Sequence, residues 1–392
     1  MRRSKLKRKL LIIGLVILSI LLFAPTGVVS APVPNYEAVF TFTGSSAGDW
    51  FGGQTSAEGD YDGDGINDLL VGAMQGIYGT GKAYLFYGKP VLTNLSATDA
   101  DLTITAERPG DELGRTVGFI GDVNGDGYDD FAVSAPSYDV SNPNNWVNHG
   151  RVYIFFGGPA RRTGTISAAT ADVKINGEYN TPRWTFGADR LRCVGDVNGD
   201  GIKDFMTASP LNHPYDGRYY NDGRAYVFFG RNSWPSEISA ASANIIIDAE
   251  AAFNILGSGL STKYGDVNGD GYADILIGAR GYSGETGRAY LFYGGPTLSG
   301  IRSASTANVI ITGAYGGQEL GVGLNLADVN GDGKDDIIVG AWDNLSSGNG
   351  RVFVFYGAPT KKSLTPPDAN LTITGEKNLA TGSVVLGFSV ET

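Results

Sequence analysis

One nine-residue pattern rich in Asp and Gly occurs five times along this chain, and it constrains the fold more than any other feature. The copies begin at Asp60, Asp122, Asp196, Asp266 and Asp328, with spacings of 62, 74, 70 and 62 residues. Their sequences are DYDGDGIND, DVNGDGYDD, DVNGDGIKD, DVNGDGYAD and DVNGDGKDD. A recurrence of this kind indicates a tandem array of similar units that pack against one another.

Each copy of the pattern lies among segments with the composition of β-strands. In the first repeat these are FGGQTSA from Phe51, LLVGA from Leu69, GKAYLFYG from Gly81 and DLTIT from Asp101. β-Branched and aromatic residues favour strands, and no segment between them has a helical period over ten residues. We therefore predict an all-β fold in which every repeat forms one four-stranded antiparallel sheet.

Radial stacking of such sheets gives a β-propeller, which buries both faces of each sheet and limits exposed edges. Gly beside the inner strands fits this fold, because backbones approach closely near the propeller axis. At the two ends, Tyr36–Thr43 resembles an unpaired outer strand and Val385–Val390 a sixth inner strand. We predict complete repeats at about residues 45–106, 107–176, 177–248, 249–312 and 313–374, and a partial sixth repeat at 375–392.

Composition excludes several classes of protein. The 58 Gly among 392 residues follow no G-X-Y period, so the chain is not collagen-like. A single Cys (Cys193) excludes an intramolecular disulfide framework and a Cys-clustered metal site. Two His leave few candidate residues for a catalytic triad. A formal net charge of −11 disfavours nucleic acid and anionic lipid as partners.

The first 30 residues predict a secretory signal peptide, with the propeller at 31–392. Met1–Lys9 holds six basic residues and no acidic one, an apolar run covers Leu10–Ala24, and small residues end at Ser30. The run of 15 residues falls short of the roughly 20 that span a bilayer, so membrane attachment is expected only if the segment stays uncleaved. Cleavage leaves 24 basic against 41 acidic residues, a net charge of −17, and places the chain outside the cell or at its surface.

The repeated acidic loop predicts a calcium site, about five in all. Side-chain oxygens at positions 1, 3, 5 and 9, a carbonyl at position 7 and Gly at position 6 suit Ca²⁺, whereas Mg²⁺ prefers a smaller shell with water. An EF-hand needs Glu at position 12, where this chain has Val71, Val133, Thr207, Ile277 and Val339. The predicted ligands are Asp60, Asp62, Asp64, Ile66 and Asp68; Asp122, Asn124, Asp126, Tyr128 and Asp130; Asp196, Asn198, Asp200, Ile202 and Asp204; Asp266, Asn268, Asp270, Tyr272 and Asp274; and Asp328, Asn330, Asp332, Lys334 and Asp336.

With these loops the chain resembles the FG-GAP repeats that build the N-terminal β-propeller of integrin α subunits. Phe51-Gly52 with Val71-Gly72-Ala73 and Phe186-Gly187 with Ala208-Ser209-Pro210 match the two halves of the motif. In the fifth repeat Leu320-Gly321 replaces Phe-Gly. The resemblance implies calcium binding and an extracellular adhesion or ligand-recognition role. It also implies seven blades, whereas this sequence completes five cycles.

The first functional hypothesis is a non-enzymatic propeller without catalytic residues that binds an extracellular protein or glycan, with mainly structural Ca²⁺. The alternatives are a polysaccharide lyase and a scaffold domain of a longer protein. We expect His149 and His213 to be solvated, although a lyase would gather His149, His213, Arg161, Arg183 and Arg218 on one face. Ligand-surface candidates are the connections Pro136–Gly150 and Pro210–Gly223, and glycosylation sequons begin at Asn94, Asn344 and Asn370.

Overall fold

The computed structural model describes residues 41–76, 79–91, 93–139, 149–178, 186–210, 222–342 and 349–375. Within these ranges the fold is nearly all β, with six sheets, five short 3-10 turns and one four-residue helix, α1 (Tyr282–Glu285). The all-β prediction is thereby confirmed. The predicted signal peptide and the strand predicted at Val385–Val390 lie outside the described residues.

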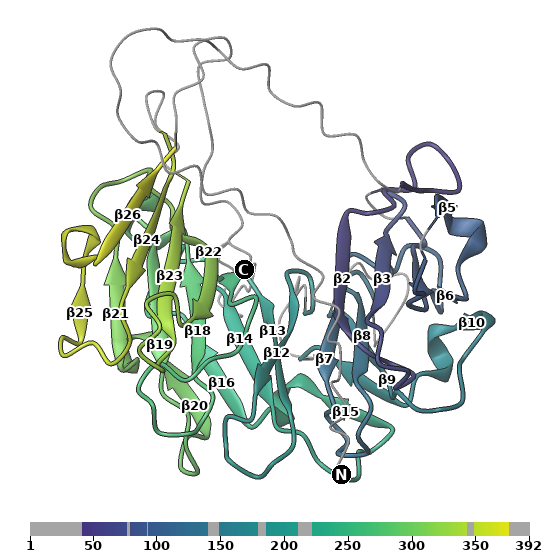
Figure 1. Cartoon of the computed structure of the whole chain (residues 1–392). Helices are drawn as coiled ribbons and strands as arrows, with labels where there is room; N and C mark the ends of the chain where they lie inside the picture. Colours follow the sequence, from purple (N-terminus) through teal and green to yellow (C-terminus); the bar gives the residue numbers. More distant parts are fainter. Residues whose placement is uncertain are drawn as a thin grey trace, which may run out of the picture. The chain divides into compact units, whose positions relative to one another are not determined.

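The five large sheets succeed one another in the order of the repeats (Figure 1). The first contains β10 (Gly164–Ser167), β6 (Leu102–Thr105), β4 (Lys82–Phe86), β3 (Asp68–Ala73) and β2 (Gln54–Gly59). The second contains β15 (Glu237–Ser239), β11 (Val173–Asn176), β9 (Arg151–Phe155), β8 (Asp130–Ala135) and β7 (Val117–Gly121). The third contains β20 (Gly300–Ser303), β16 (Ile245–Asp248), β14 (Arg224–Phe228), β13 (Asp204–Ser209) and β12 (Leu191–Gly195).

The fourth sheet contains β25 (Ser363–Leu364), β21 (Val309–Thr312), β19 (Arg288–Phe292), β18 (Ile275–Ala279) and β17 (Leu256–Leu260). The fifth contains β26 (Leu371–Thr374), β24 (Arg351–Phe355), β23 (Asp336–Ala341) and β22 (Leu320–Ala327). In each of these five large sheets four strands of one repeat pair antiparallel, as the sequence predicts.

A fifth strand in four of these sheets was not predicted. It comes from the next repeat and pairs parallel with the outer strand of the preceding one, as β10 does with β6 and β20 with β16. The two-residue strand β1 (Phe42–Thr43) pairs in the same way with β5 (Leu95–Ser96). The prediction that Tyr36–Thr43 is unpaired is therefore wrong for its described end, because β5 of the first repeat provides a partner.

Short 3-10 turns follow these added strands and hold them against the core. In three of the turns a Ser side chain accepts a hydrogen bond from the backbone two residues later, at Ser167, Ser239 and Ser303. The Ala after each Ser is fully buried and packs in the cluster that contains the preceding repeat's outer strand. The turns are η1 (Ala97–Asp99), η2 (Ala168–Thr170), η3 (Ala240–Ser242), η4 (Ala304–Thr306) and η5 (Pro366–Asp368).

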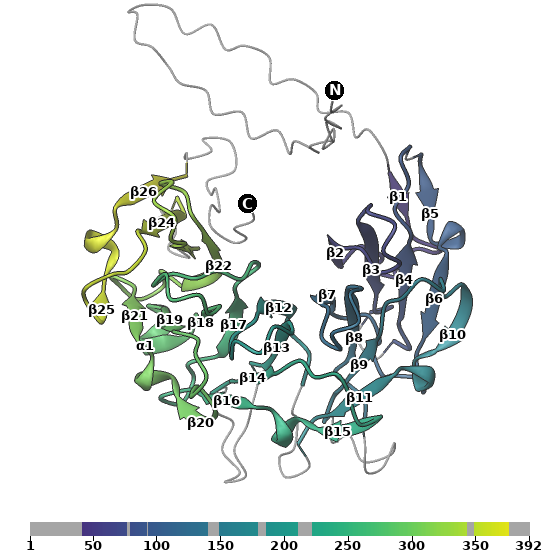
Figure 2. The same cartoon turned by 60° about the horizontal axis from the view of Figure 1, so that its bottom comes forward.

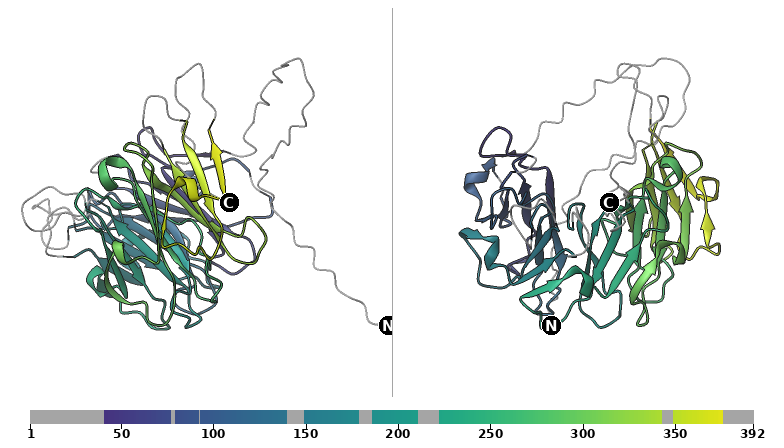
Figure 3. Two further views of the ribbon diagram at one scale, coloured as in Figure 1. Left: turned by 90° about the vertical axis from the view of Figure 1, so that its left-hand side faces the viewer. Right: turned by 180° about the vertical axis from the view of Figure 1, so that it is seen from behind.

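Neighbouring sheets pack face to face, with the first strand of each repeat innermost (Figure 2). The same succession of sheets is visible from two further sides in Figure 3. Apolar clusters lie between adjacent sheets; Phe131 and Phe155 of the second sheet, for example, share one with Leu70 of the first. A Cβ on Gly72 would lie 2.1 Å from the Gly114 carbonyl oxygen, so the expected close approach of backbones holds there. The β-propeller fold therefore follows from repeated sheets with apolar faces on both sides.

Candidate metal centre

The five acidic loops occupy one equivalent place in the fold. Each connects the innermost strand of a repeat to the next strand, as the first loop (Asp60–Asn67) connects β2 to β3. The equivalent loops connect β7 to β8, β12 to β13, β17 to β18 and β22 to β23. The repeated sequence therefore places one loop at the same edge of every large sheet.

The aspartate at position 1 folds each loop around its own carboxylate. In the first loop Asp60 accepts hydrogen bonds from the backbone N–H groups of Gly63 (2.8 Å), Asp64 (3.1 Å) and Gly65 (2.7 Å). Gly63 and Gly65 have φ values of 73° and 87°, in the left-handed region that glycine tolerates best. The same three bonds form in the other four loops, so the backbone geometry predicted from the glycines is present in all five.

Positions 3, 5 and 7 are linked by a second set of bonds. In the second loop Asp126 N–H donates to Asn124 Oδ1 (2.9 Å), and Tyr128 N–H donates to Asp126 Oδ1 (3.1 Å). The Asn124 amide also donates to Asp126 Oδ2 at 2.9 Å. This amide bond recurs in the third, fourth and fifth loops, where position 3 is likewise Asn.

The aspartate at position 9 is buried and fastens the loop to the sheet. Asp130 is fully buried; one of its oxygens accepts from Val123 N–H (2.9 Å) and the other from Gly157 N–H (2.8 Å), at the end of the aromatic strand. Burial raises the pKa of Asp130 to about 8, of Asp204 and Asp274 to about 7, and of Asp68 to about 6. A bound cation would favour the ionised form of these carboxyl groups, so they fit a metal site.

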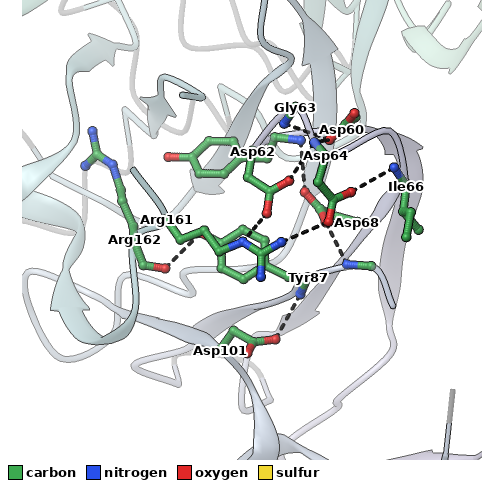
Figure 4. Close-up of polar contacts among 12 residues, drawn as sticks. Asp60, Asp62, Gly63, Asp64, Ile66, Asp68, Tyr87, Asp101, Arg161 and Arg162 are labelled. Carbon is green, nitrogen blue, oxygen red and sulfur yellow. Dashed lines mark hydrogen bonds and ion pairs between the residues drawn. The ribbon is translucent and has the colours of Figure 1, made fainter. Parts of the chain in front are cut away.

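The first loop differs from the other four at position 3, which is Asp62 instead of Asn (Figure 4). Oxygen atoms of Asp60, Asp62 and Asp68 lie within 4.8 Å of one another. The guanidinium of Arg161, from the connection between β9 and β10, forms ion pairs with Asp62 and, at 2.9 Å, with Asp64. A residue of the second repeat therefore enters the loop of the first.

The donor set of the loops suits a hard divalent cation. The side chains at positions 1, 3, 5 and 9 of every loop carry carboxylate or amide oxygens, and a carboxylate oxygen that already accepts an N–H bond keeps a second lone pair. Hydrogen bonds link positions 1, 3, 5 and 7 of each loop within one turn, and the carboxylate at position 9 accepts from the N–H of position 2. The sequence predictions named Arg161 only for the lyase alternative and missed its contact with the first loop, because it lies 97 residues from Asp64; the only available signal was the Asp at position 3.

The residues considered for a lyase do not all lie at one place. Arg161 contacts the first loop, whereas His149 is 1% exposed with Nδ1 3.4 Å from Asp139 Oδ1. The prediction that His149 is solvated is wrong, because it lies buried immediately before β9, next to the buried Asp139. Arg183, His213 and Arg218 lie outside the described residues, as do 140–148 and 211–221 of the two candidate ligand connections and the sequon at Asn344.

Family models match three stretches of this chain. The FG-GAP repeat model matches residues 51–86 and 113–155, and the FG-GAP-like repeat model matches residues 266–339. The two FG-GAP matches each contain one acidic loop with the strands that flank it, and the FG-GAP-like match contains the two loops that begin at Asp266 and Asp328.

Curated relatives fall into two groups. Integrin alpha-PS2 of Drosophila melanogaster is 29% identical over 236 residues, which cover 58% of this chain and 15% of that protein. The phosphatidylinositol-glycan-specific phospholipase D of Rattus norvegicus is 26% identical over 329 residues, covering 77% of this chain and 37% of that protein. Integrin alpha pat-2 of Caenorhabditis briggsae is 28% identical over 273 residues, 66% of this chain and 20% of its own length.

This chain thus spans less than two fifths of the length of each of these relatives. In the ranges that the structure describes, no helix is long and apolar enough to cross a membrane. The family-model matches, the pairing of one sheet with each repeat, and the integrin relatives all indicate the same type of repeat. The matches support an FG-GAP repeat, integrin α-like family for this chain, and its fold is the β-propeller of such repeats.

Proposed function

We propose that this chain is a secreted or cell-surface β-propeller that binds Ca²⁺ in its five acidic loops and recognises an extracellular protein or glycan. The observation that carries the calcium assignment is that all five loops share one hydrogen-bond scheme, which arranges side-chain oxygens that can bind a metal ion. A turn that binds no metal does not need metal-ligating oxygens at the same positions in every repeat. The proposal includes a signal peptide at 1–30 and the propeller repeats at the boundaries predicted from the sequence.

Calcium has mainly a structural role in this proposal. Extracellular modules bind Ca²⁺ with Kd values of roughly 10⁻⁴ to 10⁻³ M. At a calcium concentration ten times Kd, each site adds about 1.4 kcal/mol to the free energy of unfolding. Five sites together add about 7 kcal/mol, which is comparable to the typical net stability of about 5 to 15 kcal/mol.

Calorimetric titration of the chelator-treated chain tests the metal assignment. We expect about five Ca²⁺ ions per chain and weaker binding of Mg²⁺. Asp196→Ala removes the position-1 carboxylate of the third loop and should remove one site. Glu285→Gln, a loss of one exposed charge outside the loops, should leave the stoichiometry unchanged. Absence of calcium binding by the folded wild-type chain would refute the assignment.

A non-enzymatic recognition role is favoured over catalysis for this chain. Four matched relatives are named as phosphatidylinositol-glycan-specific phospholipase D, but the matched region is no more than 37% of any of them. Loops on a rigid scaffold commonly carry recognition, and the exposed Trp50 offers an aromatic surface for a protein or a sugar. A binding screen against glycans and surface proteins, with and without Ca²⁺, tests this role. Turnover of an acidic polysaccharide or a glycolipid by the purified chain would contradict it.

A further inference from the structure

We propose that Arg161 is a built-in competitor for the cation of the first loop, so that this loop is the weakest calcium site of the molecule and its loading releases Arg161. The inference rests on the calcium-binding function proposed above. It assigns to one loop a regulated role that the other four do not have.

Arg161 contacts two of the predicted ligands directly. Its Nε pairs with Asp62 Oδ2, and a terminal nitrogen lies 2.9 Å from Asp64 Oδ2. The Asp62 side chain is 2% exposed, whereas Arg161 is 46% exposed. The guanidinium thus neutralises a buried carboxylate that would otherwise be unpaired when no cation is present, and such a charge is costly to bury alone.

The site is also arranged to let Arg161 leave. The guanidinium carbon lies 4.8 Å from the centre of the Tyr87 ring, which offers it a cation–π contact without a carboxylate. The Tyr87 hydroxyl donates to the carbonyl of the next residue, Arg162, at 2.9 Å, and so holds the backbone beside the loop. Because the Arg161 side chain is 46% exposed, water can solvate the guanidinium when it leaves the two carboxylates.

Among the first four loops, for which the following repeat is described, this arrangement occurs only at the first. A backbone N–H of each following repeat donates to the carbonyl of loop position 2, and in the first loop this donor is Gly158, three residues before Arg161. The residues three positions after the corresponding donors, at the second, third and fourth loops, are Trp234, Leu298 and Lys361. Lys361 pairs with Asp368 at 2.6 Å instead of with the fourth loop.

The first loop differs from loops two to four both in Asp62 at position 3 and in its contact with Arg161, and the second difference compensates for the first. In loops two to five the position-3 Asn donates to Oδ2 of position 5. In the first loop Asp62 cannot donate, and Arg161 supplies that bond to Asp64. The first loop therefore replaces a neutral donor with an anion and a cation. A divalent cation at Asp62 and Asp64 is repelled by the guanidinium, and it gains a fourth carboxylate once Arg161 has moved.

Calcium binding to the first loop is thereby coupled to a contact with the second repeat. Arg161 lies three residues before β10, which pairs with β6 of the first sheet. Displacement of its side chain removes two ion pairs that join the first loop to the β9–β10 connection. Calcium binding at the first loop can thus change an inter-repeat contact.

Calcium titration of four variants of the full chain tests the proposal. Arg161→Gln should raise the calcium affinity of one site about tenfold or more, because the competitor and its repulsion are lost. Lys361→Gln is the matched control at the fourth loop and should change no site. In Asp62→Asn, which gives the first loop the position-3 residue of the others, the further change Arg161→Gln should have a much smaller effect on affinity.

A second readout separates competition from a purely structural role. In chelator, Arg161→Gln should lower the midpoint of thermal unfolding, because Asp62 loses its partner; in saturating Ca²⁺ the midpoint should return to that of the wild type or exceed it. Unchanged or weaker calcium binding by Arg161→Gln would overturn the proposal, since it would make Arg161 a support of the bound state. If the folded wild type binds no Ca²⁺ at all, the calcium function itself fails.

Discussion

The carboxylate at loop position 9 shows how one residue can serve both fold and site. Asp130, Asp204 and Asp336 are fully buried, and each accepts two backbone N–H bonds that join the loop to the end of the aromatic strand. Desolvation raises the pKa of all three. The loop residues could be predicted from sequence because their spacing is local, whereas Arg161 and the buried His149–Asp139 contact depend on segments that only the fold brings together.

A buried carboxyl outside the loops gives a prediction at the same scale. Asp111 is 3% exposed, and burial raises its pKa to about 6, although Arg108 N–H donates to it at 2.9 Å. The native state then keeps a proton that the unfolded chain releases near pH 4, so wild-type stability falls as the pH rises from about 4 to about 6. Asp111→Asn should raise the free energy of unfolding by about 1 to 3 kcal/mol at pH 7 and have little effect at pH 4.

Urea unfolding at the two pH values measures this difference, and the pH 4 data act as the internal control. A gain of the same size at both pH values would show that the substitution acts through packing and not through ionisation.

At the scale of secondary-structure elements, the added parallel strands were not predicted from the sequence. The four-stranded core of each repeat was predictable, because β-branched and aromatic residues mark each strand. The added strands are two to four residues long, too short for alternation to be recognised, and their partners belong to the preceding repeat. The recurring Ser-Ala pairs at Ser167, Ser239 and Ser303 were the available signal, and they mark the turns that follow these strands.

Outer strands differ in how deeply their apolar side chains are buried. Ile311 of β21 is 1% exposed, and the equivalent Ile373 of β26 is 48% exposed. Leu364 of the added strand β25 packs in the same cluster as Ile311. Ile311→Lys should therefore lower the free energy of unfolding by about 3 kcal/mol or more, because it buries an unpaired charge. Ile373→Lys should change it by no more than about 0.5 kcal/mol.

Chemical denaturation of the two variants beside the wild type measures both effects. Equal destabilisation by the two substitutions would mean that Ile373 is covered in solution, contrary to its exposure in the structure.

At the scale of the whole molecule, neighbouring repeats share both their cores and their ion pairs. Each of the four larger apolar clusters combines residues of adjacent sheets. Arg151 of β9 pairs with Glu237 of the next repeat at 2.8 Å, and Arg280 of the fourth repeat pairs with Glu319 of the fifth at 3.2 Å. The acidic loops add repulsion, since they hold 16 of the 41 acidic residues at ligand positions, four in the first loop and three in each other loop.

Shared cores should couple the calcium sites into one unfolding transition. If the described repeats unfold together, a tenfold rise in free Ca²⁺ above Kd adds about 1.4 kcal/mol for each linked site, or about 7 kcal/mol for five. If each repeat unfolded alone, every transition would gain only about 1.4 kcal/mol. We expect the larger value, because each cluster would be broken by separating its two sheets. Denaturant unfolding over a series of calcium concentrations, followed by both tryptophan fluorescence and far-UV circular dichroism, measures this slope. Two transitions that differ between the probes, or a slope that corresponds to a single ion, would show that the repeats bind and unfold independently.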